Sequence, residues 1–106
     1  MLEGFGYQVV VAGTGERALE IFCGKPEIDL ILMAIDLGAG RLSGTETAIR
    51  ILKIHHVPVI FLSSHAKPEV VARTERISTY GYVLKSTDGS ILDASIKMAL
   101  RLFQAN

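Results

Sequence analysis

The sequence predicts an α/β domain in which a parallel sheet has helices on both faces. Three observations carry this prediction. Short apolar runs at residues 8–12, 29–35, 59–62 and 81–84 have the length and composition of strands. A stretch with helical apolar spacing follows each run. The regular alternation of strand and helix implies parallel strands joined by right-handed helical crossovers.

The bulk properties restrict the class of protein. A chain of 106 residues is expected to form one domain, spanning residues 1–106, and a hydrophobic content of 49% excludes a disordered tail. Eleven basic and eleven acidic residues give zero net charge, which argues against direct binding of nucleic acid or anionic lipid. No apolar run is long enough to span a membrane, so a cytoplasmic protein is expected. Cys23, the only cysteine, is expected to be a packed thiol beside Phe22.

Each helix has a recognisable start. Thr14 is expected to cap a first helix that ends at Gly24. A capping-box pattern at residues 43–46 opens a second helix. Pro68 suits the first turn of a third helix that runs to Ile77.

The last helix is expected to open with Ser90 and Asp93 and to carry apolar residues on two faces. One face should pack on the sheet, and the other is a candidate contact surface. The first set is Leu92, Ile96, Ala99 and Phe103, and the second is Ile91, Met98 and Leu102.

Function is expected at the carboxyl ends of the strands, where open parallel sheets place their chemistry. These ends are residues 34–36, residues 63–65 and Lys85. Four motifs, in this order and at these separations, resemble the receiver domain of two-component response regulators over residues 2–103. They are Leu30-Ile31-Leu32-Met33-Ala34-Ile35-Asp36-Leu37, Gly44-Thr45-Glu46, Pro58-Val59-Ile60-Phe61-Leu62-Ser63-Ser64 and Gly81-Tyr82-Val83-Leu84-Lys85. The resemblance implies a flavodoxin-like (CheY-like) fold that here lacks its first strand and most of its first helix.

The resemblance also implies roles for the residues at the strand ends. Ser63 matches the hydroxyl that contacts the phosphoryl group, and Ser64 matches the small residue after it. Lys85 matches the lysine that pairs with the phosphoryl group, and Tyr82 matches the aromatic switch three residues before that lysine. The family's phosphoacceptor aspartate is replaced by Ala34, which has no nucleophilic atom.

Asp36 is the alternative acceptor. A shift of two residues keeps a strand side chain on the same face, but it places Asp36 about 6–7 Å farther along. That distance is too long for Ser63 and Lys85 to hold the same phosphoryl group. A lesser alternative is an unrelated small enzyme built on Ser63 and Lys85; otherwise no enzymatic activity is expected.

No cofactor is expected. Receiver domains hold Mg²⁺ through an acidic pair on the first strand, the phosphoacceptor aspartate and a backbone carbonyl, which corresponds here to that of Asp36. The acidic pair has no counterpart, and Ala34 offers no carboxylate.

The lack of a first strand has three interpretations: a fragment or mis-started gene, a strand supplied by a partner, or a sheet closed up to four strands. The family resemblance implies protein partners. These are a histidine kinase, a fused output domain, or a second copy joined through the last helices or by strand exchange.

Overall fold

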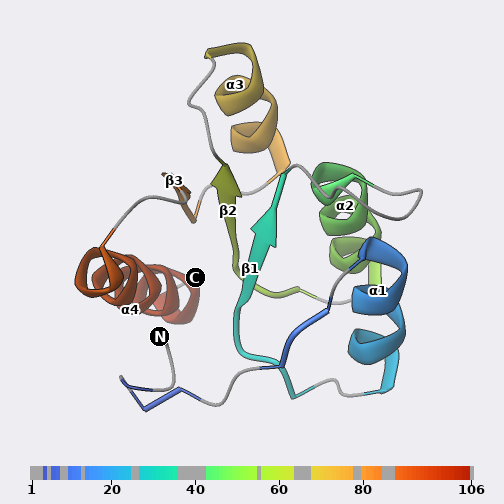
Figure 1. The fold of residues 1–106 in the computed structure, drawn as a ribbon, viewed down its shortest axis with the longest axis horizontal. Helices are drawn as coiled ribbons and strands as arrows, with labels where there is room; N and C mark the ends of the chain where they lie inside the picture. The colour runs from blue at the N-terminus through green and yellow to red at the C-terminus, as the bar shows by residue number, and fades with distance from the viewer. Residues whose placement is uncertain are drawn as a thin grey trace.

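A computed structural model describes residues 4, 6–7, 10–12, 14–24, 27–35, 43–54, 56–63, 68–77, 80–84 and 88–105. In chain order they form α1 (Gly15–Gly24), β1 (Ile31–Ala34), α2 (Gly44–Ile54), β2 (Val59–Ser63), α3 (Pro68–Ile77), β3 (Tyr82–Leu84) and α4 (Gly89–Ala105). The strands form a parallel sheet in the order β1-β2-β3 (Figure 1). The predicted α/β class is therefore confirmed.

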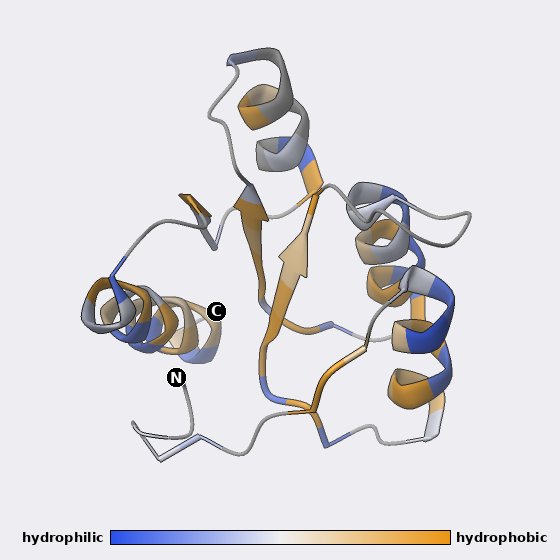
Figure 2. Cartoon of the chain, in the orientation of Figure 1, coloured by the Kyte–Doolittle hydropathy of each residue, from blue (hydrophilic) through white to orange (hydrophobic). Residues whose placement is uncertain are grey.

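The sheet separates two cores, because successive strand side chains point to opposite faces. Helices α1 and α2 lie on one side of the strands and α4 lies on the other (Figure 1). The strands that they cover are coloured as hydrophobic in Figure 2. The first core consists of Phe22, Met33, Ala48, Ile51, Val57, Val59 and Phe61. The second core consists of Ile60, Leu92, Ile96 and Ala99.

The strand predictions hold for β2 and β3 but need correction nearer the N-terminus. Of β1, only Met33 is buried, although the continuous apolar run predicted burial on both faces. The physical reason is that β1 ends the described sheet, so only one of its edges has a neighbour.

The strand predicted at residues 8–12 is not found at Val10–Ala12, the part of it that the structure describes. Val10 is 55% exposed and Val11 is 81% exposed. A β-branched sequence forms a strand only where a neighbouring strand completes its hydrogen bonds, and no described segment is paired with these residues.

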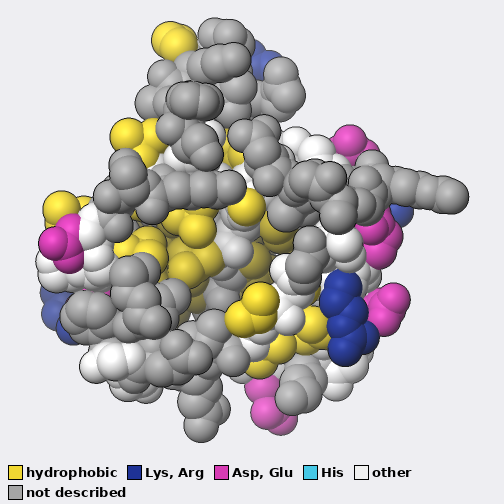
Figure 3. All heavy atoms as spheres, viewed as in Figure 1, with side chains coloured by type: hydrophobic (Ala, Val, Ile, Leu, Met, Phe, Trp, Pro, Cys, Tyr) yellow, Lys and Arg dark blue, Asp and Glu magenta, His cyan; other side chains and the backbone are white. Residues whose placement is uncertain are grey.

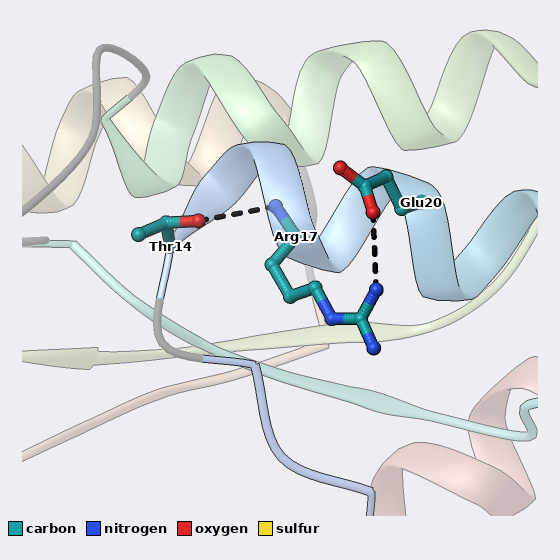
Figure 4. Close-up of polar contacts among 3 residues, drawn as sticks. All are labelled: Thr14, Arg17 and Glu20. Atoms are coloured by element: carbon teal, nitrogen blue, oxygen red, sulfur yellow. Dashed lines mark hydrogen bonds and ion pairs between the residues drawn. The ribbon is translucent and has the colours of Figure 1, made fainter.

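The predicted cap of α1 is confirmed. The Thr14 hydroxyl oxygen accepts a hydrogen bond from the backbone N–H of Arg17 at 3.1 Å, and one turn further Arg17 forms an exposed ion pair with Glu20 at 3.0 Å (Figure 4). The cap satisfies one of the backbone donors that the first turn leaves unpaired. It therefore fixes where α1 begins.

The cap of α2 is also found, whereas that of α4 was predicted wrongly. The Ser43 hydroxyl accepts from the Glu46 N–H at 3.1 Å, as a capping serine does. For α4, the capping acceptor is Asp88, whose carboxylate accepts from the Ser90 N–H at 2.9 Å. Ser90 lies inside the helix, because Asp88, two positions earlier, offers a stronger charged acceptor.

Cys23 is exposed, contrary to the prediction of a packed thiol. Successive helix residues point about 100° apart. The burial of Phe22 in the first core therefore does not bury its neighbour.

None of the helices in the described part of the chain combines the length and the apolar character needed to cross a membrane.

Candidate functional site

The candidate site is built around the carboxyl end of β1. Ala34 is the last residue of that strand and lies opposite Leu62 of β2. The next residue, Ile35, donates its N–H to the Leu62 carbonyl at 2.9 Å, which extends the ladder by one bond. The Ile35 carbonyl in turn accepts from the Gly44 N–H at 3.2 Å. The first residue of α2 is thus fastened directly to the strand end that carries Ala34.

Gly44 is a site residue whose role sequence reasoning missed. A Cβ atom at this position would overlap the carbonyl oxygen of Ala34 and lie 2.8 Å from its carbonyl carbon and 2.9 Å from the Ile35 Cα. The atoms in the way are backbone atoms, so a side chain at position 44 would have to push α2 away from β1. The available signal was a glycine at the first position of a capped helix, where its low helix propensity needs a reason.

Ser63 lies at the same end of the sheet as Ala34, whereas Tyr82 is the first residue of β3. Ser63 is the last residue of β2 and is 4% exposed; it lies one residue beyond Leu62 and so is diagonal to Ala34. Tyr82 of β3 lies opposite Phe61 of β2; it is half-buried and packs against the first core. The two positions therefore lie on neighbouring strands, with Ser63 at the carboxyl end of β2 and Tyr82 two residues further back, at the level of Phe61.

The other predicted site residues, Asp36, Ser64 and Lys85, lie outside the described residues. Each follows a described segment directly in the sequence, after Ile35, Ser63 and Leu84 respectively. Their predicted roles remain predictions.

The described strand ends offer few of the oxygen ligands that a divalent cation needs. A magnesium ion needs a shell of oxygen ligands, of which carboxylates are the main protein source. Ala34 presents a methyl group at this end of the sheet, and Ser63 presents a single hydroxyl. Within the described ranges, no three or more His, Cys, Asp or Glu residues come together in a way that could hold a metal ion.

Among the described residues, shifted pKa values are found for Asp88, for Asp93 of α4 and for Tyr7. Hydrogen bonds from Ser90 lower the pKa of Asp88. Hydrogen bonds from Tyr7 and Lys97 lower the pKa of Asp93. The bond to Asp93 also raises the pKa of Tyr7 to about 12, from an ordinary value of 10.0. These carboxylates therefore lie in or next to the last helix.

Comparison with known proteins gives one consistent result. The profile of the response regulator receiver domain matches residues 1–97. The transcriptional regulatory protein CseB of Streptomyces avermitilis is 34% identical over 103 residues, covering 96% of this chain and 42% of CseB. The chain spans less than half of the length of the curated relatives that it matches.

Solved structures agree with the sequence comparison. One is the N-terminal domain of a response regulator/sensory box/GGDEF 3-domain protein from Carboxydothermus hydrogenoformans. It is 45% identical, has a TM-score of 0.88, and is matched over 99% of this chain and 83% of that one. The signal receiver domain of a modulated diguanylate cyclase from Desulfovibrio desulfuricans G20 is 33% identical, with a TM-score of 0.85 over 98% of this chain and 82% of that one.

Proposed function

The chain belongs to the response regulator receiver domain family of two-component systems, and from that membership we propose that it is a receiver that signals without being phosphorylated. It acts as a protein-interaction module rather than an enzyme. The observation that carries the proposal is the residue that ends β1, which is Ala34. Residues 1–106 form one receiver-like domain in this proposal.

The chemistry of phosphoryl transfer supports this reading. A phosphoacceptor must supply an oxygen nucleophile, and catalysis then depends on positioning and on stabilising the charge of the transferred group. A methyl group at Ala34 supplies no nucleophile, and the described strand ends offer few oxygen ligands for the divalent cation that the family commonly binds. Ser63 and Tyr82 then remain as inherited parts of a site that has lost its acceptor.

A phosphorylation assay tests the proposal. The chain is incubated with a small phosphodonor, acetyl phosphate, and Mg²⁺, and its intact mass is measured. No mass gain is expected for the natural chain, because position 34 has no acceptor. A gain of one phosphoryl group would overturn the proposal, and loss of that gain in Asp36→Asn would assign the acceptor to Asp36.

Ala34→Asp is the matched variant for the same assay. It restores a carboxylate at the end of β1 and leaves the rest of the strand ends unchanged. If the missing carboxylate at position 34 is the only deficit, this variant gains one phosphoryl group where the natural chain does not; if the missing Mg²⁺ ligands also prevent the reaction, it gains none. Catalytic turnover of any substrate that is abolished by Ser63→Ala would instead favour the small-enzyme alternative.

The partners in this proposal are proteins: a histidine kinase, an output domain, or a second copy of the chain. Direct binding to nucleic acid or membrane is not proposed, because the net charge is zero. The surface that we assign to a second copy is the predicted outer face of α4. Its apolar side chains are exposed at intervals of seven and four residues, which places them along one stripe. They are Ile91 (57% exposed), Met98 (63%) and Leu102 (53%).

The charges beside this stripe are self-complementary. In an antiparallel pair of α4 helices centred between residues 94 and 95, Ile91 of one copy faces Met98 of the other. The same geometry brings the exposed Asp88 of one copy opposite the exposed Arg101 of the other. Both ends of such a two-fold contact would gain an ion pair.

Sedimentation analysis tests the dimer. Met98→Lys is expected to weaken self-association, because it places a charge in the middle of the stripe and a second one across the two-fold axis. Arg17→Ala, on α1, is the control surface substitution and should leave association unchanged. A dimer that survives Met98→Lys would exclude this contact and favour strand exchange.

A further inference from the structure

One polar contact joins the two ends of the described chain. The Tyr7 hydroxyl donates a hydrogen bond to Oδ1 of Asp93 at 2.6 Å, across 86 positions of sequence. Oδ2 of the same carboxylate forms an ion pair with Nζ of Lys97 at 3.0 Å. Both oxygens of Asp93 therefore have a partner, one from the N-terminal segment and one from α4 itself.

Asp93 is unusual because it lies on the inner face of α4. It is 9% exposed and stands beside Leu92 and one turn from Ile96, which are two members of the second core. A carboxylate in such a place is costly unless it is paired. Lys97 is 65% exposed, so its pairing is weakened by water. Tyr7 is consequently the less solvated of the two partners.

The Tyr7 ring also contributes to packing. It is half-buried and packs against the second core, which holds α4 on the sheet. Removing the ring from this position would uncover part of the second core and leave Asp93 without its shorter hydrogen bond. The hydroxyl and the ring of Tyr7 therefore both help to hold α4 against the sheet.

The other end of α4 is held differently. The ring of Phe103 lies 4.8 Å from that of His56 and 5.8 Å from that of Tyr80, measured between centroids. These contacts are aromatic and come from the segments before β2 and β3. The C-terminal half of α4 therefore has aromatic contacts that do not involve Tyr7 or Asp93.

We propose that the Tyr7–Asp93 contact is a latch that holds the N-terminal half of α4 on the sheet and couples it to the segment carrying Tyr7. When the latch opens, that half of the helix separates from the second core while the Phe103 end stays attached. A change in the segment that carries Tyr7 can therefore alter the attachment of α4 without involving Ala34 or Ser63. This inference does not depend on whether the domain is phosphorylated.

Amide hydrogen exchange, measured residue by residue by NMR, tests the latch. In Tyr7→Phe, exchange of the amides of residues 93–97 is expected to accelerate about tenfold, the size typical for loss of a hydrogen bond to a charged group. Exchange of residues 100–104 and of α2 should change less than twofold. Local opening of this kind is distinguished from global unfolding because only the latter exposes all helices together.

Three further variants sharpen the result. Phe103→Leu should accelerate exchange at residues 100–104 and spare residues 93–97. Lys97→Met should have a smaller effect than Tyr7→Phe, because Lys97 is the more exposed partner. The Tyr7→Phe/Asp93→Asn double variant should exchange no faster at residues 93–97 than the faster single variant, since both changes act on one contact.

Two results would overturn the latch. They are unchanged exchange at residues 93–97 in Tyr7→Phe, or an equal acceleration in α2 and α4. If Tyr7→Phe does not fold, Asp93→Ala is read in its place, because it removes the acceptor of the Tyr7 hydrogen bond. Acceleration confined to residues 93–97 supports the latch, and no acceleration or a general one refutes it.

Discussion

Replacing Gly44 by alanine should destabilise the protein, although the same change usually stabilises a helix. In an open helical position, Gly→Ala gains about 1 kcal/mol through helix propensity. At Gly44 the added methyl would overlap the carbonyl oxygen of Ala34 and approach the Ile35 Cα to 2.9 Å. No rotamer change can relieve a clash with backbone atoms, so α2 and the end of β1 must separate.

The magnitude follows from these two opposing effects. Forced backbone shifts cost about 1–3 kcal/mol, and the involvement of backbone on both sides places Gly44→Ala near 3 kcal/mol. Subtracting the propensity gain of about 1 kcal/mol leaves a net loss of about 2 kcal/mol. For a domain of this size, that loss lowers Tm by about 10 °C.

The chain offers a matched control. Gly24 ends α1, and a Cβ atom there meets nothing within 4 Å. Urea denaturation of both variants, with equal m-values, would report the difference as a shift in midpoint. We expect Gly24→Ala to be neutral or slightly stabilising and Gly44→Ala to be the less stable by about 2 kcal/mol or more. Equal midpoints would show that α2 does not rest on the Ala34 carbonyl.

Three other predictions concern the rest of the fold. Thr14→Ala should cost about 1 kcal/mol in urea denaturation through loss of the α1 cap, whereas Arg17→Ala should stay within about 0.5 kcal/mol because its ion pair is exposed. Ile51→Ala should cost about 2–5 kcal/mol, since Ile51 is 1% exposed in the first core; a smaller loss would mean that the site collapses. The lowered pKa of Asp93 stabilises the fold above pH about 3.9, and this stabilisation is lost as the pH falls below that value. The raised pKa of Tyr7 stabilises the fold below pH 10, and this stabilisation is lost as the pH rises toward 12. Urea midpoints measured across pH check both, and Tyr7→Phe should flatten the alkaline loss.

The order of helices and strands could be predicted from the sequence because local residue patterns determine it. The first four residues of β2, 59–62, are an unbroken apolar run, and Thr14 is a common capping residue in front of a helical stripe. Such signals need no knowledge of what lies across the fold.

The incorrect predictions, in contrast, concern residues whose structure depends on contacts with distant parts of the chain. Val10 and Val11 have strand composition, but a strand also needs a paired neighbour. Asp93 was assigned to the opening of the last helix, whereas its partner is Tyr7 at the other end of the chain. The constraint on Gly44 comes from a carbonyl ten residues earlier. Each of these depends on contacts that the local pattern does not specify.

The site was predictable in position but only partly in detail. The carboxyl ends of parallel strands meet at one edge, so Ala34 and Ser63 could be placed there from the sequence. The diagonal arrangement of Ala34 and Ser63, and the contact of α2 with Ala34, depend on the pairing of β1 with β2.

The division of the interior by the sheet has a consequence for engineering. Of the strands in the described part of the chain, only β2 supplies fully buried side chains to both sides, with Phe61 in the first core and Ile60 in the second. In Figure 3 the hydrophobic side chains visible on this face of the molecule gather toward its middle, and charged ones lie toward the periphery. Chimaeras that take α4 from one homologue and α1 with α2 from another should therefore combine nearly additively, provided that they share one middle strand.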